Sequence, residues 1–187
     1  MSHALFRKVV LGLSLVVLLG ARAQAQSELL HDTWMKVKVQ VKGFTALEDG
    51  SLKKGAAKTV AYLHFLPPEV EGVADLQFQI WCEVEPGSWE PVDEGDMSTL
   101  GSGDLLFLDI FMGFVAPDGA FFGGYHTGTI KVKTDKSGET LKKATMKTLG
   151  GECIDASLDG QFPFGGSLKV SGSTIPASKL PFNPMPV

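Results

Sequence analysis

Apolar and polar side chains alternate strictly along several segments of this chain, and that alternation limits the folds it can adopt. Between residues 34 and 42, Met35, Val37, Val39 and Val41 fall on one side, and lysines and a glutamine occupy the positions between them. Successive side chains of a β-strand point to opposite faces, so the pattern predicts a strand with one buried face and one wet face. Segments 59–66 and 76–84 continue the pattern.

Turn signals divide the rest of the chain into further strands. Residues 85–88 are Glu-Pro-Gly-Ser, with Pro and Gly at the central positions of a type II turn. The most apolar later segment, 105–115, fits either a buried strand or a helix by periodicity alone, and the Pro-Asp-Gly turn at 117–119 favours the strand. We expect eight or nine strands, the later ones over 120–133, 140–149, 153–162 and 165–173.

Consecutive strands joined by short turns predict an all-β fold built as an antiparallel meander. Unpaired sheet edges are avoided if the sheet closes, so we expect an up-and-down barrel, with a two-sheet β-sandwich as the alternative. A membrane barrel is disfavoured, because lysines stand where lipid-facing residues would be apolar. These lysines are at positions 36, 38, 42, 131, 133, 143 and 147.

The first 25 residues have the layout of a secretory signal peptide. Arg7 and Lys8 precede an apolar run over 9–19, and small residues lead up to Ala25. We therefore expect cleavage after Ala25, one β domain over 26–174 and a Pro-rich tail over 175–187. The expected product is soluble, periplasmic or extracellular, and without a transmembrane anchor, since no later stretch approaches roughly 18 apolar residues. The sequence leaves the oligomeric state open.

Net charge argues against one class of partner. The chain carries 17 basic and 21 acidic residues, and Arg7, Lys8 and Arg22 belong to the leader. The remaining 14 basic and 21 acidic residues give a net charge of −7. Such a protein repels phosphate backbones, so we expect no nucleic-acid partner.

Cys82 and Cys153 remain after the leader. In an oxidising compartment a disulfide between them and two separately buried thiols are both open interpretations. Asp93, Glu94 and Asp96 are weak candidates for a metal site, but their spacing matches no calcium-loop signature, and a solvated acidic loop is the better interpretation. We expect neither a metal nor a cofactor.

Aromatic rings concentrate in the two strands expected at 105–115 and 120–133. If these strands form a hairpin, their rings and one histidine would line an apolar pocket inside the barrel. The alternative is that the same rings simply fill the core. The candidate ligand-binding residues are Phe107, Phe111, Phe122, Tyr125 and His126.

Three functions are compatible with these features. The first is a non-enzymatic barrel that binds a small apolar or amphipathic molecule. The second is an envelope structural or protein-interaction module with a filled core, acting through the Pro-rich tail or a patch such as Trp34, Trp81 and Trp89. The third is an enzyme using His64 or His126, which we rank last because no motif supplies their catalytic partners.

Overall fold

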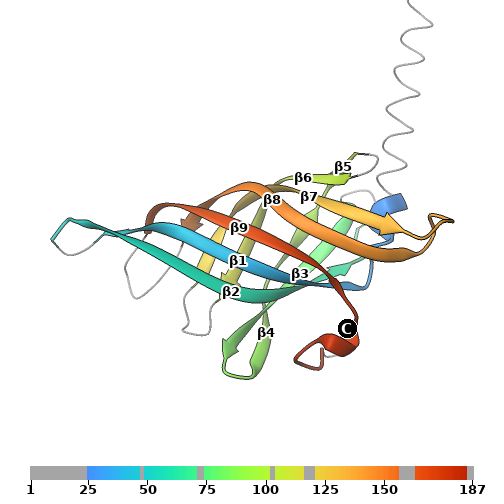
Figure 1. The fold of residues 1–187 in the computed structure, drawn as a ribbon, viewed down its shortest axis with the longest axis horizontal. Helices are drawn as coiled ribbons and strands as arrows, with labels where there is room; N and C mark the ends of the chain where they lie inside the picture. The colour runs from blue at the N-terminus through green and yellow to red at the C-terminus, as the bar shows by residue number, and fades with distance from the viewer. Residues whose placement is uncertain are drawn as a thin grey trace, which may run out of the picture.

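The chain folds as a meander of β-strands in a single antiparallel sheet. The structure is a computed structural model that describes residues 25–46, 49–70, 74–101, 104–115, 121–155 and 163–184. The sheet has nine strands in the order β4-β3-β2-β1-β9-β8-β7-β6-β5. Their bounds are β1 Thr33–Ala46, β2 Leu52–Leu66, β3 Leu76–Glu85, β4 Ser88–Met97, β5 Thr99–Leu100, β6 Asp104–Val115, β7 Phe121–Thr134, β8 Leu141–Asp155 and β9 Pro163–Ile175 (Figure 1).

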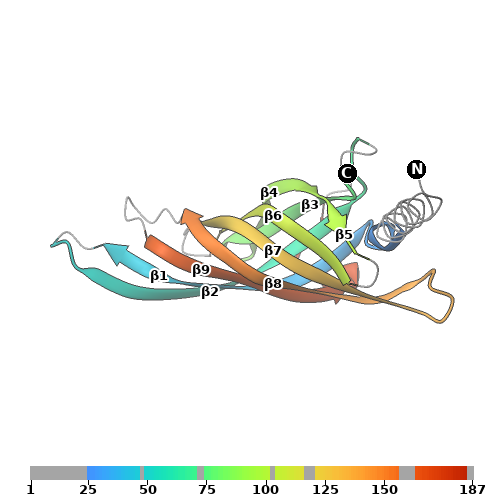
Figure 2. The ribbon, with the colours of Figure 1, turned by 90° about the horizontal axis from the view of Figure 1, so that it is seen from above.

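Pairing of the first long strand with the last curls the sheet into a half-barrel (Figure 2). The register between β1 and β9 runs from Trp34 opposite Ile175 to Thr45 opposite Pro163. The predicted all-β antiparallel meander is confirmed, and segment 105–115 is a strand rather than a helix. Because β1 and β9 are joined, the two free edges of the sheet fall on β4 and β5, which are neighbours in sequence.

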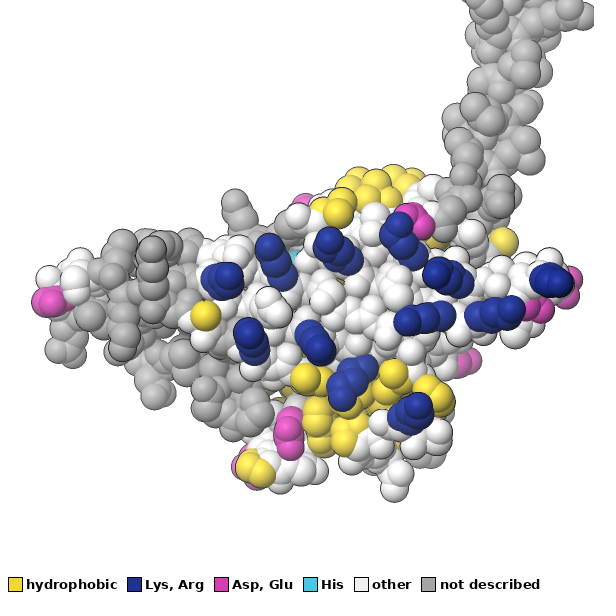
Figure 3. Space-filling model, viewed as in Figure 1, with side chains coloured by type: hydrophobic (Ala, Val, Ile, Leu, Met, Phe, Trp, Pro, Cys, Tyr) yellow, Lys and Arg dark blue, Asp and Glu magenta, His cyan; other side chains and the backbone are white. Residues whose placement is uncertain are grey.

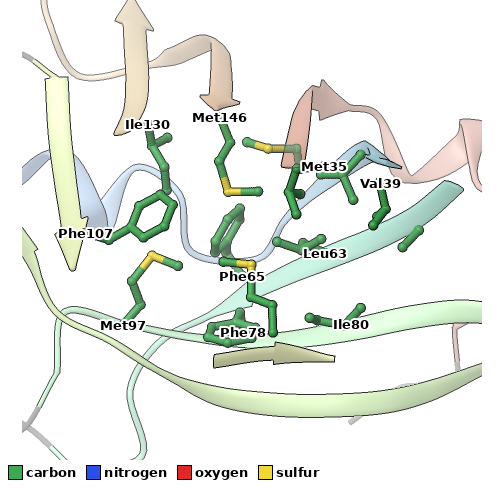
Figure 4. Packing of buried hydrophobic residues seen from close by; sticks show 14 of the residues in the cluster. Met35, Val39, Leu63, Phe65, Phe78, Ile80, Met97, Phe107, Ile130 and Met146 are labelled. Carbon is green, nitrogen blue, oxygen red and sulfur yellow. The ribbon is translucent and has the colours of Figure 1, made fainter. Parts of the chain in front are cut away.

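Strand alternation decides which side chains form the core. The alternating apolar residues of β1, from Met35 to Val41, are buried, and the lysines between them are exposed. In β3, Leu76, Phe78, Ile80 and Cys82 are buried in the same manner. Figure 4 shows the result: apolar side chains from strands on different sides of the half-barrel point toward one another and pack.

The β4 edge of the sheet packs against β6, which β5 pairs only at Leu106 and Phe107. The strand order contains no backbone ladder between β4 and β6 among the described residues, yet the two strands pack against each other. Side chains make the connection: Asp93 Oδ2 accepts a hydrogen bond from the Gly113 N–H at 2.6 Å, and Cys82 Sγ accepts one from the Val115 N–H at 3.3 Å. We use "seam" for this side-chain junction.

The structure describes the chain from Ala25 at the N-terminal side to Pro184 at the C-terminal side. The expected leader occupies residues that lie, except for Ala25, outside the described part. No helix in the described part is long and apolar enough to cross a membrane. After β9, the 3-10 helix η1 (Ala177–Lys179) is followed by residues 180–184, which pack back onto the outer face of the sheet.

Candidate functional site

The structure divides the five residues predicted to line an interior pocket. Phe107 and His126 are fully buried, whereas Phe111 and Tyr125 are 37% and 48% exposed and contact each other edge to face, with ring centroids 5.4 Å apart. The side chain of Phe122 lies outside the described residues. An interior ligand therefore stays a prediction, with two of its five proposed contacts on the outside of the sheet.

A bulge in β6 separates Phe107 from Phe111. Strict alternation would place these two residues on one face. The pairing with β7 shifts register between Phe107 and Ile110, and Asp109 in this interval has a φ of 54°. A bulge adds one residue and reverses the facing of everything after it, so Phe107 points inward and Phe111 outward.

The two histidines named as possible bases have different surroundings. His126 is buried, and neither ring nitrogen has a hydrogen-bond partner within the described chain. Burial lowers the pKa of His126 to about 4, so the ring is neutral at ordinary pH. His64 stacks on Trp34 with centroids 4.2 Å apart, and burial lowers its pKa against the opposing charge of Asp32.

The structure describes the surroundings of the acidic candidates and of Cys82, but not those of the Cys153 side chain. Asp93 accepts hydrogen bonds from the Gly113 and Glu94 backbone N–H groups, and burial raises its pKa. No three potential metal ligands gather in the part of the chain that the structure describes. Cys82 is a free thiol whose pKa burial raises to about 11, and the side chain of Cys153 is not described, so their disulfide is not shown.

Four aromatic side chains on the outer face of β1 to β4 surround the ring of Phe182 from the C-terminal tail. The Phe182 ring lies nearly parallel to Trp81 (5.0 Å between centroids, 10°) and to Trp89 (5.4 Å, 21°). It meets Trp34 (5.7 Å, 72°) and Tyr62 (5.6 Å, 79°) edge to face. We call Trp34, Tyr62, Trp81 and Trp89 the aromatic cage.

Strand register assembles this cage. Trp34 stands opposite His64, and Tyr62 stands opposite Trp81, so rings from three neighbouring strands share the outer face. The tail covers positions that alternation alone would leave wet: Trp34 is 5% exposed and Tyr62 is 4% exposed. The indole N–H of Trp81 is buried without a hydrogen-bond acceptor among the described residues.

Basic residues gather on the other part of the outer face. Residues 59–130 contain no Lys or Arg but hold 12 of the 21 acidic residues, so β3 to β6 are acidic, and the lysines fall on β1, β2, β7, β8 and β9. Figure 3 shows these lysines in dark blue across the face, beside a yellow hydrophobic patch. The exposed lysines of these strands include Lys36, Lys38, Lys42, Lys58, Lys131, Lys133, Lys143, Lys147 and Lys169.

A groove of about 560 Å³ lies among these lysines, over β1, β9, β8 and β7. Hydroxyl side chains and a glycine form much of its lining, and lysines stand on both sides. A second groove of about 520 Å³ lies on the other side of Lys36 and Lys38 and reaches Tyr62 and Trp89 of the aromatic cage. We call the first of these the lysine groove; its polar lining residues are Lys36, Lys38, Thr129, Lys131, Thr145, Lys147, Ser171 and Ser173.

Comparison with known proteins identifies no relative that would assign a role to this site. No family model matches the chain, and neither the curated proteins nor the solved structures give a match.

Sequence reasoning named Trp34, Trp81 and Trp89 as one patch and missed Tyr62 and Phe182. The patch was expected to be exposed, but Trp34 is buried under the tail. A signal for the site was present, because Trp34 and Trp81 both stand on the polar side of alternating strands. Nothing local in the sequence connects these positions to Phe182, which follows Trp81 by about 100 residues.

Proposed function

We propose that this protein is an exported, non-enzymatic binding module whose aromatic cage accepts an aromatic side chain from an extended, proline-flanked segment of a partner protein. The observation that carries the proposal is the ring of Phe182 stacked on both Trp81 and Trp89. The segment that places this ring in the cage is Pro181-Phe182-Asn183-Pro184. The tail thus contains the proline-flanked aromatic residue that we expect in the partner segment. In this arrangement the tail acts as a ligand in cis.

The cage contacts are individually modest, which suits an exchangeable occupant. Stacked and edge-to-face ring pairs contribute about 0.5 to 1.5 kcal/mol each beyond their buried area. Proline flanks restrict the free segment to extended conformations and so reduce the entropy lost on docking. These two terms favour recognition of a short peptide.

Trp81 supplies a reason for the tail to give way. Its buried indole N–H has no acceptor among the described residues, and an unmet buried donor costs roughly 1 to 3 kcal/mol. Phe182 has no polar side-chain atom to meet it. A partner segment that places a carbonyl or hydroxyl oxygen near Trp81 gains this bond and competes with the tail, whose effective concentration in cis is on the order of millimolar.

A ligand inside the half-barrel is a second candidate, and His126 is the observation that supports it. Both of its ring nitrogens are buried without partners among the described residues, so an interior polar ligand would satisfy them. The surrounding interior side chains pack against one another, as in Figure 4, and we therefore place the cage first.

The proposal is tested by emptying the cage and offering the tail in trans. Phe182→Ala is titrated with a synthetic peptide of residues 176–187 while tryptophan fluorescence is recorded. We expect saturable binding to the emptied variant and at least tenfold weaker binding to the unmodified protein. A peptide with Ala at the Phe182 position is the ligand control, and Phe111→Ala, which removes an exposed ring elsewhere, is the protein control.

Two results would overturn the proposal: a folded Phe182→Ala variant that does not bind the peptide, or equal binding of the Phe and Ala peptides. Phe182→Leu, which keeps an apolar side chain in the cage, separates this from simple loss of folding. If Phe182→Ala unfolds and Phe182→Leu stays folded yet never releases its tail to a competing peptide, the tail is a structural clasp. Export is checked independently by the mass of the secreted product, which should begin at Gln26.

A further inference from the structure

The lysine groove is a second site, independent of the aromatic cage. We propose that it binds an acidic polysaccharide, with lysine ammonium groups contacting carboxylate or sulfate groups and the hydroxyl side chains contacting sugar hydroxyls. The groove is open in the structure, whereas the cage holds Phe182. The lysine groove itself shares no lining residue with the cage, so the two proposals fail separately.

Strand register gives the groove a repeated pattern. Across β1, β9, β8 and β7, two neighbouring rows each combine two lysines with two hydroxyl residues. Positive charges thus stand on both sides of a polar floor, as a linear polyanion requires. The two rows are Lys36-Ser173-Thr145-Lys131 and Lys38-Ser171-Lys147-Thr129.

Most of the groove lysines keep their charge available. The only ion pair in the described part of the chain joins Lys131 to Asp104 at 2.9 Å, at the β6 border of the groove. Lys36 Nζ lies 5.7 Å from the Tyr62 ring centroid, which leaves its charge uncompensated. The groove is therefore locally positive although the chain as a whole is acidic.

Long-range repulsion by the acidic strands does not prevent this binding. Salt screens exposed charges beyond about 8 to 10 Å at ordinary ionic strength, while the groove lysines act at contact distance. Binding of this kind releases counterions from the polymer. Its affinity therefore falls steeply as the salt concentration rises.

The lining chemistry favours a sugar polymer over nucleic acid or a membrane. The residues that line the lysine groove include no aromatic ring on which bases would stack. A bilayer surface would leave a hydroxyl floor between lysines unused. Sugar hydroxyls both donate and accept hydrogen bonds and so match Ser and Thr side chains.

The second groove extends the surface along which a polymer would lie. It shares Lys36 and Lys38 with the lysine groove and adds Lys58 and Gln40 on its far side. One extended chain crossing these two lysines would contact both hollows. Binding should therefore strengthen with polymer length up to the span of the two grooves.

Direct titration tests the assignment, with heparin and polygalacturonate as sulfated and carboxylated probes, dextran as the neutral control, and double-stranded DNA and phosphatidylglycerol vesicles as the competing anions. We expect both acidic polysaccharides to bind and dextran not to bind. The groove variant is Lys38→Gln with Lys147→Gln. The matched control is Lys136→Gln with Lys179→Gln, which makes the same change in net charge outside the groove.

We expect the groove variant to bind the acidic polysaccharides at least tenfold more weakly and the control to change by less than twofold. Ser171→Ala with Ser173→Ala should weaken polysaccharide binding about threefold. The proposal is overturned if neither polysaccharide binds, if the two lysine pairs have equal effects, or if DNA or vesicles bind more tightly. Circular dichroism of each variant verifies that the fold is retained.

Discussion

The half-barrel is held together differently on its two sides. On one side, which we call the closed half, β2, β1, β9, β8 and β7 are joined by backbone ladders, and the β8–β9 ladder is interrupted between Lys147 and Glu152. On the other, the seam half of β3, β4, β5 and β6, β3 and β4 meet β6 through the side chains of Asp93 and Cys82. Backbone ladders tolerate little displacement, whereas side-chain bonds can adjust, so the two halves should respond differently to mutation.

Charge and function follow the same division. The closed half carries lysines and the open groove, whereas the strands of the seam half carry acidic residues and no Lys or Arg. The aromatic cage takes Trp34 and Tyr62 from the closed half and Trp81 and Trp89 from the seam half. Phe182 therefore ties the two halves together on the outside, as the core does on the inside.

The largest expected effect is that of Gly172→Ala, at the join between β1 and β9. A Cβ at this position would overlap the Lys36 carbonyl oxygen and lie 2.8 Å from the Val37 Cα, so backbone must move. Overpacking of this kind costs roughly 3 kcal/mol of unfolding free energy. Urea denaturation at pH 7 measures it, with Ser171→Ala, an exposed position one residue away, expected within about 0.5 kcal/mol of the parent. Equal stability of the two variants would show that the join is not tight.

Lowering the pH should change stability in opposite directions in the two halves, through His126 in one and Asp93 in the other. The folded-state pKa of His126, in the closed half, is about 4 and lies below its usual value of 6.5. Its contribution to stability is therefore complete above about pH 6.5 and is lost as the pH falls toward 4, by about 3 kcal/mol at pH 4. The pKa of Asp93, in the seam half, is raised, so protonation of this carboxyl favours the fold instead.

His126→Phe isolates the first of these two contributions, because it removes the titrating ring and keeps a similar shape. Unfolding free energies of the parent and the variant are compared at pH 7 and pH 4. The parent should lose about 3 kcal/mol more than the variant between these values. Parallel pH profiles would mean that acid reaches His126 equally in the folded and unfolded chain.

The sequence predicts the strands well because their information is local. Alternation over 34–42 and 76–84 reports directly which side chains are buried, and Pro-Gly at 86–87 marks the hairpin between β3 and β4. Alternation does not predict which side chains are buried beyond the bulge in β6. The bulge depends on Asp109 adopting a left-handed φ of 54°, which Asp tolerates but no neighbouring residue demands. Extrapolating alternation through it placed Phe107 and Phe111 on one face.

The candidate sites depend on distant positions, which a single sequence does not connect. The aromatic cage needs the register of four strands and a tail residue far along the chain. The lysine groove needs β1 beside β9, a pairing of the first strand with the last. Net charge does not report this arrangement either, because a total of −7 after the leader conceals a lysine face and an acidic half.

The smallest of these effects is expected at the seam, from Asp93→Ala. The change leaves the Gly113 N–H without its acceptor at 2.6 Å and should cost about 2 kcal/mol at pH 7. Asp93→Asn is the matched control: it keeps an oxygen acceptor and removes the half-buried charge, so it should cost less than half as much. Hydrogen exchange at Gly113 should accelerate in the Ala variant, while the Val37 amide, in the closed half, should keep its protection. If instead Asp93→Ala costs as much as Gly172→Ala and both amides exchange faster together, the seam is as rigid as the β1 to β9 join, and the two halves form one cooperative unit.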